Sequence, residues 1–210
     1  ATSALDPELV RGVLDVMRSL AEGGAPRIAY GLLQTLAWQV ETFGFHMVEM
    51  EFRQHSTVHA RALADIEQNG RQGERGQLDP MTTEVLNTFR ALGAIQKRGG
   101  LSAARRYIVS FTKSAQDIAN VYRLNELAFA HPEDVPTIEV IPLFEQLEDL
   151  EHAVDILDDM LDIPAVQNLL AHNGRSMEIM LGYSDSSKDA GPTTATLALH
   201  TAQDRIARWA

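Results

Sequence analysis

Residues 138–161 read IEVIPLFEQLEDLEHAVDILDDML, an apolar run followed by a polar stretch in which apolar residues recur at helical spacing. Residues 138–144 are typical of a strand, and residues 146–161 are typical of an amphipathic helix. The same order of strand, polar stretch and helix recurs elsewhere in the chain. This repetition decides the fold class, because successive strand–helix units build parallel sheets with crossover helices.

Four strand–helix units are predicted, with three additional helices. The expected strands span residues 45–52, 106–111, 138–144 and 177–181. The helices that follow them are expected at residues 57–68, 115–128, 146–161 and 193–209. The additional helices are expected at residues 6–22, 26–42 and 81–97. The Gly- and Arg-rich stretch 68–79 predicts a mobile surface loop. We therefore expect a helix-rich α/β fold.

Composition narrows the class of protein. The 210 residues are 45% hydrophobic and 22% charged, which predicts one folded domain or two small ones. A net charge of −11 argues against nucleic acid as a partner. The chain has no cysteine, so disulfides and thiolate metal sites are excluded. No apolar run is long enough to span a membrane, and the start of the chain lacks a signal-peptide pattern, so we expect a cytoplasmic protein.

Charged side chains follow three of the predicted strands. Arg53 comes after the first, Glu145 after the third, and the expected loop 182–191 after the fourth contains Asp185 and Lys188. Parallel β/α structures bind ligands at the carboxyl ends of their strands. Two carboxylates from separate strand ends suit Mg²⁺, and the two cations could hold an anion. The pattern predicts a metal-assisted reaction on a small phosphorylated or carboxylated substrate.

Four segments resemble motifs of the phosphoenolpyruvate carboxylase family, and they occur in the family's order. They are FGFHMVEMEFRQHSTVH at residues 43–59, RYIVSFTKSAQD at 106–117, IPLFEQLEDL at 141–150 and GYSDSSKDAG at 182–191. The last is similar to the family signature GYSDSxKD followed by AG or GG. The resemblance implies a partial TIM-like (β/α) barrel with about four parallel strands and surrounding helices, with residues 1–210 forming a single segment of a larger enzyme.

The resemblance also implies a reaction and roles for site residues. The family converts phosphoenolpyruvate and bicarbonate to oxaloacetate and phosphate with Mg²⁺ or Mn²⁺, by phosphoryl transfer to bicarbonate and then carboxylation. On matching positions, Glu145 and Asp185 would be metal ligands and Arg53 would contact the substrate phosphate. Lys188 would lie near the substrate or bicarbonate. The chain departs from the family at Pro192-Thr193, where an aromatic pair is common.

Two family motifs are absent from the sequence, a TAHPTE-type histidine motif and an FHGRGG-type loop. We therefore expect the 210 residues alone to be inactive. The alternative is a non-catalytic relative that acts as a structural or self-association module through its open sheet edges. Another metal-dependent barrel enzyme acting on phosphoenolpyruvate or pyruvate is a further alternative. Self-association into a homo-oligomer is expected, without nucleic-acid or membrane partners.

The four site residues also have plain structural interpretations. Glu145 could be a helix cap or a solvated acid, Asp185 could be a turn or cap residue, and Lys188 could be a surface lysine. Arg53 could pair with one of the neighbouring acids, Glu49 or Glu51.

Several other residues are expected to be structural. His55 and His59, four apart, are predicted to lie at the surface or to support the site without binding metal, and His46 is predicted in the core. The acidic residues of the third helix are expected on a solvated face: Glu148, Asp149, Glu151, Asp155, Asp158 and Asp159. The core is expected to include Met160, Met177 and Met180. Arg105 and Arg106 are expected to be structural or interfacial.

Overall fold

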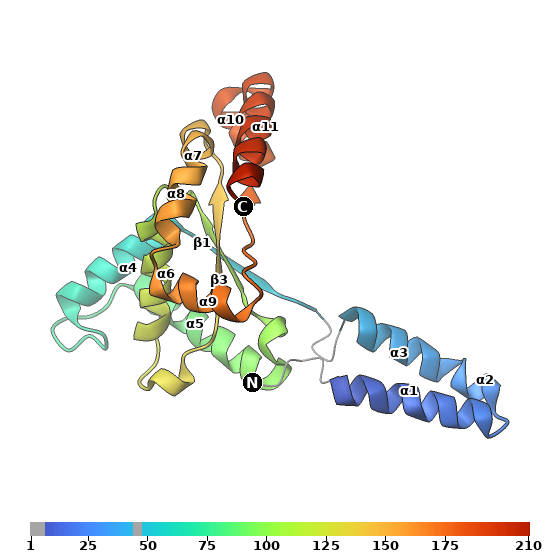
Figure 1. Ribbon diagram of the computed structural model, residues 1–210. Helices are drawn as coiled ribbons and strands as arrows, with labels where there is room; N and C mark the ends of the chain where they lie inside the picture. The colour runs from blue at the N-terminus through green and yellow to red at the C-terminus, as the bar shows by residue number, and fades with distance from the viewer. Residues whose placement is uncertain (1–6, 44–47) are drawn as a thin grey trace. The chain divides into compact units, whose positions relative to one another are not determined.

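The computed structural model describes residues 7–43 and 48–210. The chain divides into two compact units (Figure 1). One comprises residues 1–51 and 91–105, and the other comprises residues 52–90 and 106–210. The predicted site residues all belong to the second unit. The predicted core position His46 lies outside the described residues.

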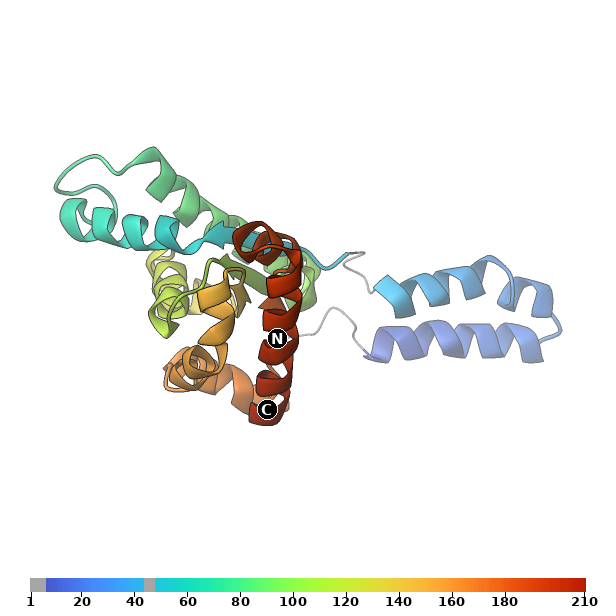
Figure 2. The same ribbon diagram turned by 90° about the horizontal axis from the view of Figure 1, so that it is seen from above.

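The first unit contains the helices α1 (Pro7–Glu22), α2 (Pro26–Ala29) and α3 (Leu32–Phe43). Figures 1 and 2 show α1 and α3 side by side. The prediction of one helix over residues 26–42 is wrong, because the chain leaves the helix at Tyr30 and Gly31. Glycine has the lowest helix propensity apart from proline, so a break at this point is favourable.

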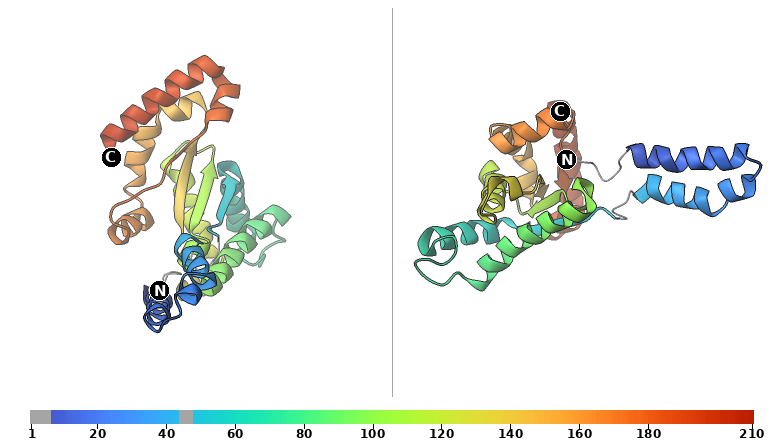
Figure 3. Two further views of the ribbon diagram at one scale, coloured as in Figure 1. Left: turned by 90° about the vertical axis from the view of Figure 1, so that its right-hand side faces the viewer. Right: turned by 90° about the horizontal axis from the view of Figure 1, so that it is seen from below.

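The second unit is built on a parallel sheet with the strand order β1-β2-β3-β4. The strands are β1 (Glu51–His55), β2 (Arg106–Ser110), β3 (Glu139–Phe144) and β4 (Met180–Leu181). Figure 3 (left) shows β2 and β3 side by side. Their register places Ile108 opposite Ile141. Phe144 in turn lies opposite Leu181 of β4. The predicted helix-rich α/β fold is confirmed, and the sheet is consistent with part of an α/β barrel.

Two strands differ from their predicted bounds. The first was expected at residues 45–52, partly outside the described residues, but β1 begins at Glu51 and contains Arg53. The fourth was expected at residues 177–181, but only its last two residues pair with β3. The apolar pattern identified both segments, but pairing with the neighbouring strand decides the residue at which each strand begins.

The helices around the sheet follow the predicted strand–helix order, with three differences. They are α4 (Ser56–Asn69), α5 (Pro80–Gly99), α6 (Ala115–Leu127), α7 (Leu147–Glu151), α8 (Ala153–Met160), α9 (Pro164–His172), α10 (Tyr183–Ala190) and α11 (Pro192–Trp209). The single helix expected at 146–161 is broken at His152, α9 was not predicted, and α10 replaces an expected loop. Figure 2 shows α4 and α5 joined by the stretch 70–79, which is outside helices and strands as predicted.

The core of the second unit includes Ile108, Ile141 and Leu143, with Met180 packed against them. Met160 is fully buried, as predicted. His59 is also fully buried, so of the two alternatives predicted for it, the surface position is wrong and the supporting role stays a prediction.

Two further expectations concern charged residues. The expectation of a wholly solvated acidic face is wrong at Asp149, which is buried because its carboxylate caps the start of α7. Arg106 has a structural role, since its Nε lies 2.8 Å from Glu178 Oε2. Across the described ranges, none of the helices combines the length and apolar character needed to cross a membrane.

Candidate active site

Glu145 follows the last residue of β3 and is 4% exposed. Its Oε1 accepts a hydrogen bond of 3.3 Å from the backbone N–H of Phe111, which comes directly after β2. Phe111 has a φ of 54°, a left-handed conformation that is unusual for a bulky residue. The Glu145 side chain is therefore held by backbone from a neighbouring strand end.

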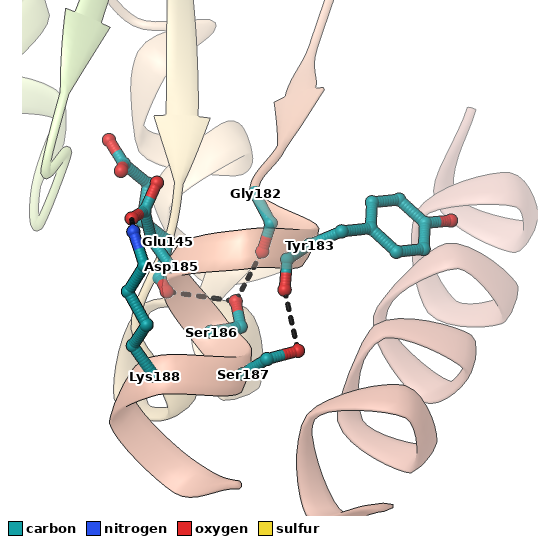
Figure 4. Close-up of polar contacts among 7 residues, drawn as sticks. All are labelled: Glu145, Gly182, Tyr183, Asp185, Ser186, Ser187 and Lys188. Carbon is teal, nitrogen blue, oxygen red and sulfur yellow. Dashed lines mark hydrogen bonds and ion pairs between the residues drawn. The ribbon is translucent and has the colours of Figure 1, made fainter. Parts of the chain in front are cut away.

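Asp185 and Lys188 lie one turn apart on α10, which begins directly after Gly182 (Figure 4). Lys188 Nζ lies 2.9 Å from Asp185 Oδ1. The expectation of a loop here is wrong. Asp185 in the first turn and Lys188 in the last favour a helix, because they complement the helix dipole. The helix ends at Gly191, whose φ of 80° suits glycine.

Three hydrogen bonds hold α10 against the end of β3 and the start of α7. The N–H of Gly182 donates to the Phe144 carbonyl at 2.9 Å. The Ser186 hydroxyl lies 2.8 Å from the Glu145 carbonyl oxygen. The Asp189 carboxylate accepts a 3.0 Å bond from the N–H of Leu147. The segment that carries Asp185 is thus tied to the segment that carries Glu145.

The Glu145 and Asp185 carboxyl groups lie near each other, and their surroundings move their pKa values in opposite directions. Burial is the largest cause of the raised pKa of Glu145, and the nearby Asp185 charge adds to it. The hydrogen bond from Lys188 is the largest cause of the lowered pKa of Asp185. Glu145 is therefore the more readily protonated of the two acids, and Asp185 stays ionised to lower pH.

Arg53 is placed at the same site by β1. Its Nη2 lies 3.3 Å from the sulfur of Met180, the first residue of β4. Its positive charge lowers the pKa values of both Glu145 and Asp185. The structure thus brings together all four residues proposed from the sequence, whose chemical roles stay predictions.

The donor set fits a hard divalent cation. Two carboxylates from adjacent strand ends converge, and Mg²⁺ is commonly held by one or two carboxylates with water and substrate oxygens. In the part of the chain that the structure describes, no group of three or more histidine or acidic side chains could form a complete protein cage. Glu145 and Asp185 would therefore hold a cation whose remaining positions are open to other ligands.

Comparison with known proteins gives matches to a single family along almost the whole chain. A family model described as phosphoenolpyruvate carboxylase matches residues 4–75 and 68–210. The chain belongs to the phosphoenolpyruvate carboxylase family. The phosphoenolpyruvate carboxylase of Bradyrhizobium diazoefficiens is 32% identical over 90% of this chain and 24% of the relative. Those of Nitrosomonas europaea and Mycobacterium avium are 28% and 31% identical, over 96% and 94% of this chain.

The chain spans about a quarter of the length of these curated phosphoenolpyruvate carboxylases: 24% of the Bradyrhizobium protein, 25% of the Nitrosomonas protein and 24% of the Mycobacterium protein. The matched residues include Arg53, Glu145, Asp185 and Lys188. The part of the chain that matches the family model therefore includes the strand ends at which these four residues meet.

Sequence reasoning missed the residues that support the carboxylates. Gly182 is needed because a Cβ at this position would lie 3.1 Å from Glu145 Cγ and 3.3 Å from its Cα. The glycine within the phosphoenolpyruvate carboxylase signature was a usable signal for this close approach. Phe111 carried no signal, because only the folded backbone reveals its positive φ. Ser186 lies within the signature, but its sequence context does not distinguish it from Ser187.

Proposed function

We propose that the chain is a segment of a phosphoenolpyruvate carboxylase that supplies the metal-binding carboxylates of the active site. In this proposal residues 1–210 form one continuous segment of a larger barrel enzyme. A single observation carries the proposal. Asp185 and the buried Glu145 come together at the ends of the adjacent parallel strands β3 and β4, on segments joined by the hydrogen bond from Ser186 to the Glu145 carbonyl. Two ionised carboxylates that lie this close repel each other, and a bound divalent cation would offset that repulsion in addition to Lys188 and Arg53.

The proposed cofactor is Mg²⁺ or Mn²⁺, held by Glu145 and Asp185. When bound, it would supply charge neutralisation for the oxygen atoms of the substrate. Glu145 must lose its proton to become a ligand, so metal affinity should rise as the pH increases. Binding also requires Asp185 to exchange its contact with Lys188 for the metal, at least in part.

The proposed substrates are phosphoenolpyruvate and bicarbonate. Arg53 approaches from β1 and is suited to contact the phosphate, because its planar guanidinium can bind two oxygens at once. Lys188 is exposed at the end of a flexible stem, which suits a mobile contact to the substrate or bicarbonate. Both residues would bind and orient anions at the carboxylate pair.

Metal binding tests the proposal directly. Mn²⁺ binding to the purified chain, measured by electron paramagnetic resonance of the free ion, should be weakened by more than about tenfold in Glu145→Gln and Asp185→Asn. Glu148→Gln is the matched control, because Glu148 is an exposed acid on the adjacent α7. Unchanged binding in both site variants would contradict the proposal.

Catalysis by the 210 residues alone is a separate question. We expect no phosphoenolpyruvate-dependent oxaloacetate formation, since the two motifs noted above are absent from this sequence. Measurable turnover would contradict that expectation without affecting the proposed metal ligands. The alternative, a self-association module, is favoured by the two outer strands of the described sheet, β1 and β4. If the chain is such a module, Glu145→Gln should not change its Mn²⁺ affinity.

A further inference from the structure

We propose that Ser186 is a positioning residue for the two carboxylates, setting the separation of Asp185 from Glu145 through its buried hydroxyl. This inference rests on the proposed metal site. Ser186 is 1% exposed, and its Oγ lies 2.8 Å from the carbonyl oxygen of Glu145. The bond joins the residue after Asp185 to the backbone of Glu145 itself. This hydrogen bond therefore lies within one residue of both carboxylates.

The neighbouring serine shows what is specific about this contact. Ser187 donates its hydroxyl to the carbonyl of Tyr183, four residues earlier in the same helix, and to no other group among the described residues. The Ser186 hydroxyl also contacts the equivalent carbonyl, that of Gly182. In addition, it contacts the carbonyl of Glu145, so the hydroxyl lies between the two carbonyl oxygens (Figure 4). Ser187 thus contributes within α10 alone, whereas Ser186 connects α10 to the end of β3.

The geometry on either side of this bond leaves little freedom for Glu145. On one side, the Phe111 N–H holds its carboxylate. On the other, Gly182 packs against its Cα and Cβ without space for a side chain. Metal ligands must be held to within about 0.5 Å of their productive geometry. A rotation or shift of α10 would move Asp185 relative to an almost fixed Glu145, and Ser186 opposes that shift.

Loss of the Ser186 hydroxyl should loosen α10 without unfolding it. Two further contacts remain, namely the Gly182 N–H to Phe144 and the Asp189 carboxylate to the N–H of Leu147. The Glu145 carbonyl would lose a buried donor, and an unsatisfied buried acceptor favours a local rearrangement. The predicted effect is therefore on the position of Asp185 and on metal affinity.

The test compares Ser186→Ala with Ser187→Ala, a matched pair on adjacent residues of one helix. Mn²⁺ affinity of the full chain should fall by about 10- to 100-fold in Ser186→Ala, the range for residues that orient metal ligands. Ser187→Ala should leave it within about twofold of wild type. Without metal, amide hydrogen exchange across residues 182–190 should be faster in Ser186→Ala than in Ser187→Ala. Ser186→Cys, which keeps a weak donor, should bind with intermediate affinity and serves if the alanine variant does not fold.

The outcomes separate this inference from the proposed function. Equal Mn²⁺ affinity in the two alanine variants, with normal binding by the wild type, overturns the role of Ser186 and leaves the metal site intact. If the wild type does not bind Mn²⁺, the proposed function fails. In that case hydrogen exchange decides the role of Ser186, because equal exchange in the two variants overturns it and faster exchange in Ser186→Ala supports it.

Discussion

His59 and Tyr107 form a buried polar pair between α4 and β2. Their Nε2 and hydroxyl oxygen atoms share a hydrogen bond of 2.9 Å, and both residues are almost wholly inaccessible to solvent. Burial, assisted by the nearby His55, lowers the pKa of His59 to about 4. Its Nδ1 has no hydrogen-bond partner among the described residues. His59 is therefore neutral in the folded protein, and protonation in the core would be unfavourable.

Acid should destabilise the fold through His59. The unfolded state, with an ordinary pKa near 6.5, binds more protons than the folded state between pH 6.5 and 4. Stability therefore falls as the pH decreases through that window, by about 3 kcal/mol in total. Urea unfolding at several pH values measures the effect.

The double variant His59→Leu/Tyr107→Phe is the control for this prediction. It removes both hydrogen-bonding groups together, so neither is left unsatisfied. Its stability should decrease less between pH 6.5 and 4 than that of the wild type, although the acidic residues titrate in both proteins. An identical pH dependence of the two free energies of unfolding would contradict the prediction.

Among the helices and strands, the sequence correctly predicted those in which the pattern of apolar residues is long and regular. The strands β2 and β3 and the helices α4, α6 and α11 lie within one or two residues of their expected bounds. The segment 183–190 was misjudged because Ser and Asp favour loops when considered alone. It is helical because tertiary hydrogen bonds from Gly182, Ser186 and Asp189 stabilise a short helix that propensity does not.

The part of the candidate site that the order and direction of the strands determine was predictable from the sequence. Parallel strands bring their carboxyl ends to one edge, so Glu145 and Asp185 could be expected to converge. Arg53 was expected after the first strand and lies within it, yet it still reaches the pair. The contact from Phe111 was not predictable, because it depends on a backbone conformation that its residue type disfavours.

The close approach of β3 and the start of α10 gives an element-scale prediction at Gly182. Gly182→Ala should destabilise the fold by about 1–3 kcal/mol, because the added Cβ would lie 3.1 Å from Glu145 Cγ. The backbone is not the cause, since the φ of −89° is accessible to any residue. Mn²⁺ affinity should fall too, as Glu145 is displaced. Urea unfolding and the Mn²⁺ binding measurement check both effects.

Gly12→Ala provides the contrasting control. Gly12 lies inside α1, and a Cβ there would have no neighbouring atom within 4 Å. Alanine should therefore stabilise the helix by about 0.5–1 kcal/mol. Destabilisation of similar size by both substitutions would show that close packing against Glu145 is not the reason.

At the scale of the whole molecule, two surfaces favour self-association. The strands β1 and β4 are the outer members of the described sheet. Separately, the first unit has an apolar cleft of about 550 Å³ lined by Arg27, Ile28, Leu32, Leu33 and Leu36. Leu32 is 90% exposed, and clustered exposed apolar residues are typical of interaction surfaces.

We expect the purified chain to sediment as a concentration-dependent oligomer. The double variant Leu32→Lys/Leu36→Lys should weaken association, because it places two charges in the apolar cleft. Leu197→Lys is the control, since Leu197 is an exposed leucine on α11 in the other unit. Sedimentation velocity of a strictly monomeric wild type would contradict the expectation. An equal effect of Leu197→Lys would show that the cleft is not the specific interface.

The cluster of Arg53, Glu145, Asp185 and Lys188 has a consequence for the order in which ligands bind. When both acids are ionised, two negative and two positive side chains cancel, so the empty cluster has little overall attraction for an anion. Adding a divalent cation leaves a surplus of two positive charges at the same edge of the sheet. Because Lys188 and Asp185 form an exposed ion pair that water screens, separating them costs little. A bound metal would therefore change a neutral cluster into an anion receptor, and by linkage a bound anion should retain the metal in return.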